Sequence, residues 1–168
     1  RYGDNAATCG FNTRWRDWSF RLLEEICAYP VDGIFYDGPI VFTARGGCYC
    51  PSCRKKFRER FGAEMPLLDR KNPDDFARLR EFGVGSLEEY YRDAMAVIRT
   101  ARPGIVGYAN YANVAEPDFS SGRSNRRLIR HMDCLLAEGG FTYGRVAESG
   151  FFKVGASSRL YESQAGGK

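Results

Sequence analysis

The first regular pattern along the chain is an amphipathic helix over residues 15–28, "WRDWSFRLLEEICA". Trp18, Leu22 and Ile26 recur at every fourth position, which places them on one helical face. Pro30 follows and ends the pattern, because proline cannot continue a helix.

Two further helices are expected. Residues 53–62, "CRKKFRERFG", end in a glycine that suits a helix C-cap. Residues 87–101, "LEEYYRDAMAVIRTA", form the other, with Ser86 as N-cap and Glu89 as its capping-box partner. Between these helices, residues 63–84 contain two prolines and a glycine and are expected to be irregular.

Three short apolar runs predict strands. They are residues 34–36 in "VDGIFYDGP", residues 105–111, "IVGYANY", and residues 133–141, "DCLLAEGGF". A short helix is expected over 126–132, before the last strand, and one more within residues 151–163.

Helices and strands therefore alternate, which predicts parallel strands and an α/β fold. Each strand ends in polar or glycine-rich sequence, at Asp37-Gly38, Asn110 and Glu138-Gly139. Ligands of parallel α/β folds bind at the carboxyl ends of the strands. These strand ends are the first candidates for a functional site.

The chain has 168 residues, of which 43% are hydrophobic and 27% charged, as in an ordinary globular domain. A complete (β/α)8 barrel typically takes about 250 residues. The chain begins with Arg1 rather than methionine and ends in "SQAGGK" without a closing element. We therefore expect a single α/β segment over residues 1–168 that is truncated at both ends.

The net charge of +4 is mild, and basic residues are mixed with acidic ones in stretches such as "CRKKFRERFGAE". This mixture favours a solvated helix face over a nucleic-acid surface. No apolar run reaches the roughly 20 residues that span a bilayer, so we expect no membrane partner.

Three of the six cysteines, Cys48, Cys50 and Cys53, lie within the stretch "GGCYCPSCRKKF". Closely spaced thiolates suit a tetrahedral soft-ligand cation such as zinc, and the basic residues that follow favour thiolates electrostatically. A redox pair and a disulfide are the alternatives. The redox pair is disfavoured because this Cys-x-x-Cys follows a loop rather than opening the helix of a thioredoxin-like unit.

A structural zinc site normally has four protein ligands. Cys9 precedes the first helix, so it lies on the same side of an α/β unit as the loop with Cys48, Cys50 and Cys53. His131 sits in a basic helix and is expected to be a surface or packing residue, which leaves Cys9 as the better fourth ligand. The two remaining cysteines lie in apolar sequence and are expected to be small buried residues: Cys27 and Cys134.

These stretches also carry a family resemblance. In this order, "CGFNTRWRDW", "VDGIFYDGP" and "CYCPSCRKKFRERFG" resemble the middle of a glycoside hydrolase barrel, the hypothetical glycosyl hydrolase 6 family, related to family 42 β-galactosidases. The resemblance covers residues 7–62 and, more weakly, "LLAEGGF". It implies a partial (β/α)8 TIM barrel, about strands four to six with their helices, and a structural zinc on Cys9, Cys48, Cys50 and Cys53.

The chain departs from family 42 at the end of strand four. That family has Asn-Glu there, with the glutamate as acid/base, whereas this chain has Tyr36-Asp37. Some retaining α-glycosidase barrels use an aspartate after strand four as nucleophile and a carboxylate after strand six as acid. By that resemblance Asp37 is the nucleophile or acid/base and Glu138 its partner. Each carboxylate can alternatively cap a helix or pair with an arginine.

Four residues near the strand ends are candidates for a sugar subsite, because aromatic faces stack on the C–H surfaces of sugars. They are Tyr36, Asn110, Tyr111 and Phe141, with core packing as the alternative, above all for Tyr36.

The sequence thus predicts a segment of a retaining, two-carboxylate glycoside hydrolase with a structural zinc, inactive as this chain alone. The expected partner is a carbohydrate substrate, with no nucleic acid; a cytoplasmic location is favoured, and homo-oligomerisation of the full-length protein stays open. The alternatives are a non-catalytic zinc-stabilised carbohydrate-binding or interaction module and a redox-sensing domain.

Overall fold

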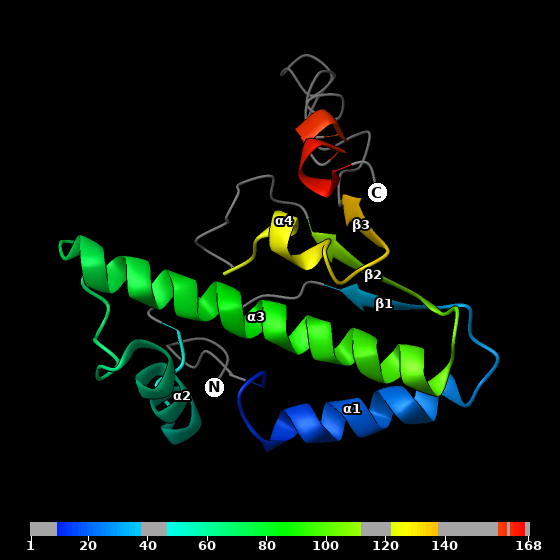
Figure 1. Cartoon of the computed structure of the whole chain (residues 1–168), viewed down its shortest axis with the longest axis horizontal. Coiled ribbons are helices and arrows are strands. Elements are labelled where there is room, and N and C mark those ends of the chain that lie inside the picture. The colour runs from blue at the N-terminus through cyan, green and yellow to red at the C-terminus, as the bar shows by residue number, and fades with distance from the viewer. Residues whose placement is uncertain (1–9, 38–46, 112–121, 138–157, 161, 167–168) are drawn as a thin grey trace, which may run out of the picture.

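Helix α3, Pro73–Ala101, is the longest element and packs along helix α1, Arg14–Cys27 (Figure 1). The computed structural model describes residues 10–37, 47–111, 122–137, 158–160 and 162–166. The remaining elements are β1 (Gly33–Asp37), α2 (Pro51–Phe61), β2 (Val106–Tyr111), α4 (Asn125–Leu128) and β3 (Cys134–Ala137). Residues 158–160 and 162–165 are also helical, within the last helix that the sequence predicts or just beyond it.

Helix α1 confirms the first predicted helix but turns a different face to the core. Its N-cap is Thr13, whose hydroxyl accepts a hydrogen bond from a backbone N–H that the helix start would otherwise leave unpaired. The buried positions are Ser19, Leu23 and Cys27, whereas Trp18 is 52% exposed. The apolar face predicted from Trp18 is therefore wrong by one position, or about 100° around the helix.

Helix α2 carries the basic stretch that follows the cysteines. It begins at Pro51, which suits the first helical turn because that turn has no use for the missing N–H. It ends at Gly62, which is left-handed at φ 65° and donates its N–H to the carbonyl of Arg58. The predicted helix and its glycine cap are confirmed, with the start two residues earlier than Cys53.

The start of α3 contradicts the sequence prediction. Residues 73–84 are helical rather than irregular, and Ser86 lies inside the helix instead of capping it. The true N-cap is Asn72, whose side chain accepts a hydrogen bond from the backbone N–H of Asp75. Pro73 occupies the first turn, where proline is tolerated. Among the described residues no helix is both long and apolar enough to cross a membrane.

A long-range contact explains why glycine is found inside α3. A Cβ at Gly85 would overlap the guanidinium of Arg60 from α2. That guanidinium lies across α3 and pairs with Glu81 at 2.8 Å and with Glu89 at 3.4 Å. Gly85 therefore makes room for the side chain that fastens α2 to α3, and the glycine does not end the helix.

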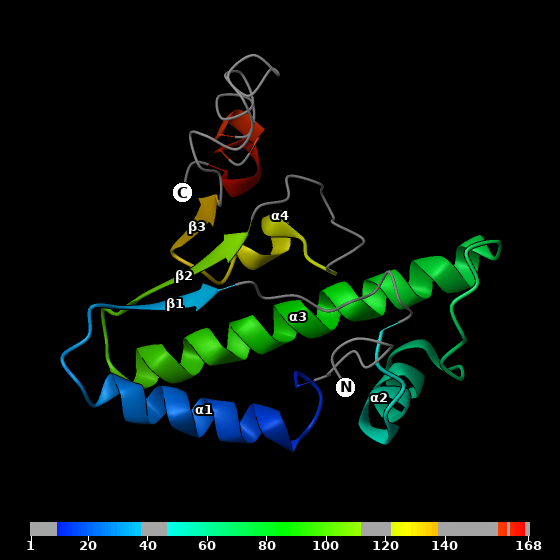
Figure 2. The same cartoon turned by 180° about the vertical axis from the view of Figure 1, so that it is seen from behind.

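The three strands form one parallel sheet in the order β1-β2-β3, as the alternation of helices and strands predicts (Figure 2). The register pairs Asp37 with Asn110 and Asn110 with Leu136, so these three residues lie at the same level near the carboxyl edge. Residues 138–141 of the predicted third strand lie outside the described residues.

The two faces of the sheet differ. Ile34 and Ala109 are buried in one core together with side chains from α1, α3 and α4. On the opposite face Phe35, Val106 and Leu136 are 45%, 43% and 47% exposed. Helices thus cover one face, and the other presents apolar side chains to solvent.

A second, smaller core joins α2 to the first half of α3. It consists of buried Cys53, Phe57, Leu79 and Phe82, with Cys48 and Cys50 packed against it. The cysteine loop is therefore continuous with this core.

We expect Phe57→Ala to lower the free energy of unfolding by about 3–5 kcal/mol, because a fully buried aromatic ring is lost from this core. Leu67→Ala is the control: Leu67 is 77% exposed, and its loss should change stability by less than about 0.5 kcal/mol. Urea unfolding followed by circular dichroism measures both. Equal effects of the two substitutions would contradict the packing described for α2.

Candidate metal centre

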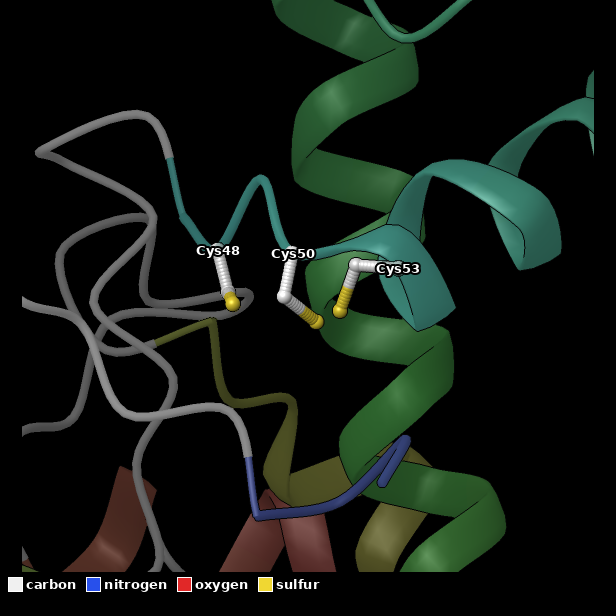
Figure 3. A group of neighbouring side chains, drawn as sticks. All are labelled: Cys48, Cys50 and Cys53. Carbon is white, nitrogen blue, oxygen red and sulfur yellow. The ribbon is translucent and has the colours of Figure 1, made fainter.

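The sulfur atoms of Cys48, Cys50 and Cys53 all lie within 4.8 Å of one another (Figure 3). Cys48 and Cys50 come from the loop before α2, and Cys53 comes from the first turn of that helix. Gly47 precedes them with a left-handed φ of 77°, which turns the backbone so that the loop wraps around its own thiols. Thiols gathered in this way suit a soft cation.

Local sequence positions these side chains. Cys50 is the N-cap of α2 in an extended conformation, and Pro51 fixes the first helical residue. Cys53 follows three residues later and is only 1% exposed, whereas Cys48 and Cys50 are half-buried. The Cys-x-x-Cys pair therefore opens a helix. The sequence argument that it merely follows a loop, which disfavoured the redox alternative, is wrong.

The electrostatic surroundings are set mainly by backbone rather than by the expected basic side chains. The positive end of the α2 macrodipole favours negative charge on the first-turn thiol of Cys53. Arg54 donates to the carbonyl of Tyr49 at 2.9 Å, Lys55 lies 3.8 Å from Glu59, and Lys56 pairs with Glu89. Each of the three basic side chains thus has another partner.

A polar side chain from outside the loop, that of Asn12, also contacts the cluster. The side-chain nitrogen of Asn12 lies 3.5 Å from the sulfur of Cys53, as a hydrogen-bond donor. Sequence reasoning missed Asn12, since nothing in the pattern around it signals a contact with a residue 41 positions away. Cys9, the expected fourth ligand, lies outside the described residues, three positions before Asn12.

The other cysteines that the structure describes, and His131, do not join the cluster. Cys27 is buried in the main core, as expected, while Cys134 opens β3 and is only half-buried. Burial raises the pKa of the Cys27 thiol, and the positive charge of Arg102 offsets part of that effect. His131 packs against α3, where its Nε2 lies 3.4 Å from a carboxylate oxygen of Glu88. This agrees with the packing role expected for His131.

The strand ends hold a second group of polar residues. Asp37, the last residue of β1, accepts a hydrogen bond of 3.0 Å from the side-chain amide of Asn110. Asn110 is 9% exposed, and its carbonyl accepts a 2.9 Å hydrogen bond from Arg123. Tyr111 ends β2. Glu138 and Phe141 lie outside the described residues.

Tyr36 points away from this group. Its ring meets that of Tyr91 on α3 edge-to-face, with centroids 5.0 Å apart, on the face of the sheet opposite to Phe35 and Asp37. Burial raises the pKa of its hydroxyl. The core-packing alternative therefore describes Tyr36.

No protein-family model matches the chain, and no curated protein sequence does so either.

In the chain kept metal-free with EDTA, we expect iodoacetamide at neutral pH to modify Cys50 at least about tenfold faster than Cys27, because burial and the raised pKa leave little thiolate at Cys27. Mass spectrometry of tryptic peptides measures both rates. In urea the two rates should converge. Equal rates in the folded protein would contradict the burial of Cys27.

Proposed function

We propose that Cys9, Cys48, Cys50 and Cys53 bind one structural zinc ion, and that this centre stabilises the strand-end loops of a barrel-type glycoside hydrolase. The observation that carries the proposal is the convergence of three sulfur atoms within 4.8 Å. A tetrahedral zinc with bonds of about 2.3 Å places its sulfur ligands about 3.8 Å apart. The three thiols need to approach by only about 1 Å to reach that geometry.

The reach of the chain supports Cys9 as the fourth ligand. Asn12 is already 3.5 Å from Cys53, and Cys9 is three residues upstream. Three extended residues span about 10 Å at most, so Cys9 is within reach of the other three sulfur atoms. A closed set of four thiolates leaves no position for substrate, which is the pattern of a structural site rather than a catalytic one.

A redox function is the second candidate, because Cys50 and Cys53 open a helix. A dithiol at a helix start is the arrangement of thioredoxin-like active sites. That reaction needs only two thiols, whereas here Cys48 is the third within the same 4.8 Å. We therefore favour the metal centre and leave thiol exchange as the outcome that a failed metal test would support.

The arrangement of the sheet supports a partial barrel. Strand order follows chain order, and α1, α3 and α4 all contribute to the core on one face of the sheet. In a (β/α)8 barrel the helices cover the outer face and the inner face is packed against the other strands. The exposed Phe35, Val106 and Leu136 lie on the face that such strands would cover.

The strand ends support a catalytic role for Asp37 and Glu138 in that barrel. The side-chain nitrogen of Asn110 donates to a carboxylate oxygen of Asp37 and fixes its orientation, which suits the role of nucleophile. Glu138 directly follows β3, two strands away from β1. Two strand spacings are about 10 Å, so both side chains must lean inward to flank one glycosidic bond.

The proposed substrate is a carbohydrate. Asn110 fixes the position of Asp37, and Tyr111 and Phe141 are candidates for the sugar subsite. A zinc-stabilised module that binds carbohydrate without cleaving it is the non-catalytic alternative. The two share the metal centre and differ only in whether the carboxylates turn over substrate.

We expect the chain to bind one zinc ion, with Cys9→Ser and Cys53→Ser each lowering affinity at least about 100-fold through loss of a thiolate ligand. Competition between Co²⁺ and Zn²⁺ followed by visible absorption gives the affinities. Cys134→Ser is the control and should leave them unchanged, because Cys134 opens β3 away from the cluster. A Cys9→Ser variant that binds as tightly as the unaltered chain contradicts the proposed ligand set.

For catalysis, we expect Asp37→Asn and Glu138→Gln each to lower kcat on glycosides with poor leaving groups by roughly 10²–10⁴-fold, tested in a protein in which further strands complete the barrel. Substrates with different leaving groups distinguish the two roles. Loss of the acid, Glu138, should lower kcat little when the leaving group is an activated aryl group, whereas loss of Asp37 should lower kcat for every substrate. Binding of sugar without turnover in the unaltered protein would favour the non-catalytic module.

A further inference from the structure

The side chain of Asn12 joins the cysteine cluster to two helices. Its nitrogen lies 3.5 Å from the sulfur of Cys53 and 3.0 Å from the hydroxyl of Ser86, in the middle of α3. Its oxygen accepts a 2.8 Å hydrogen bond from Lys56, on α2. One amide therefore contacts the first turn of α2, the second turn of the same helix and α3.

The partners of Asn12 determine which end of the amide faces the sulfur. A lysine ammonium can only donate, so the atom nearest Lys56 must be the amide oxygen. The nitrogen then faces Cys53, and Ser86, which can accept as well as donate, is compatible with that orientation. Because Lys56 is itself paired with Glu89 of α3, the orientation is held from both sides.

The contacts also explain a polar residue inside α3. Serine is neutral to unfavourable in a helix interior unless its hydroxyl has a defined partner. Ser86 is 2% exposed and accepts from Asn12. The Ser86 hydroxyl oxygen thus gives the side-chain nitrogen of Asn12 a second acceptor besides the Cys53 sulfur.

We propose that Asn12 is a positioning residue of the metal centre: its amide donates to the Cys53 sulfur and so stabilises the negative charge and the orientation of that ligand. The inference rests on the metal site proposed above. Cys53 is 1% exposed, and a thiolate so far from water needs donors from the protein. Groups that hydrogen-bond to metal ligands commonly alter metal affinity by 10–100-fold when they are removed.

The sharpest test is Asn12→Asp. The carboxylate has the shape of the amide, can pair with Lys56 and can accept from Ser86, so packing is retained while the donor to sulfur is replaced by a negative charge. We expect the affinity for Co²⁺ and for Zn²⁺ to fall about 10–100-fold. We also expect the sulfur-to-cobalt charge-transfer band to move to longer wavelength, because loss of a hydrogen bond raises the energy of the sulfur lone pair.

Two variants serve as controls. Asn72→Asp makes the same change of charge at the exposed N-cap of α3, where aspartate also caps well, and should leave affinity and spectrum unchanged. Ser86→Ala removes the other acceptor of Asn12 but keeps the contact with sulfur, and should leave the charge-transfer band in place. Asn12→Leu, which removes the donor without adding charge, repeats the measurement should Asn12→Asp fail to fold.

The outcomes are distinct. Weaker binding with a shifted band in the Asn12 variants alone supports the inference. Unchanged binding in these variants, with metal bound by the unaltered chain, overturns it and leaves the zinc proposal standing. Weaker binding with an unshifted band assigns Asn12 a purely structural role and overturns the inference. Absence of metal binding in the unaltered chain overturns both proposals.

Discussion

Three sulfur atoms within 4.8 Å of one another repel once they are ionised, so as thiolates they need positive charge nearby. The nearby basic side chains contribute little, because Arg54, Lys55 and Lys56 have other partners. A metal cation satisfies this constraint most directly. In the centre we propose, one metal ion holds the loop and the N-terminus of α2, and Asn12 and Ser86 join it to α3, the helix on which the sheet packs.

Much of the fold follows from local sequence. The glycine at the end of α2 and the three short apolar runs of the sheet act over a few residues, and each was predicted; the proline that starts α2 is equally local but was not used. The start of α3 was missed although its cap, Asn72 before Pro73, is local, because the prolines and the glycine of residues 63–84 suggested an irregular segment. Gly85, inside the same helix, is a site of close packing against Arg60, 25 positions away, and only the position of α2 shows this.

In the candidate site too, local sequence determines some features and the packing of distant elements determines others. Three of the proposed ligands lie within six residues, so their spacing alone predicted that they would meet. Asn12 contacts groups 41, 44 and 74 residues away, and its role depends on how α1, α2 and α3 pack. At the strand ends, the sequence identified Asp37 and Asn110 but could not tell that Asn110 serves the carboxylate, or that Tyr36 faces α3.

We propose that this protein holds its strand-end loops together with a zinc ion bound by four cysteine sulfurs. X-ray absorption at the zinc edge, measured on the chain purified with its native metal, tests this most directly. We expect four sulfur scatterers at about 2.3 Å and no nearer nitrogen or oxygen. A first shell that contains nitrogen or oxygen, or a protein that carries no zinc, would contradict it.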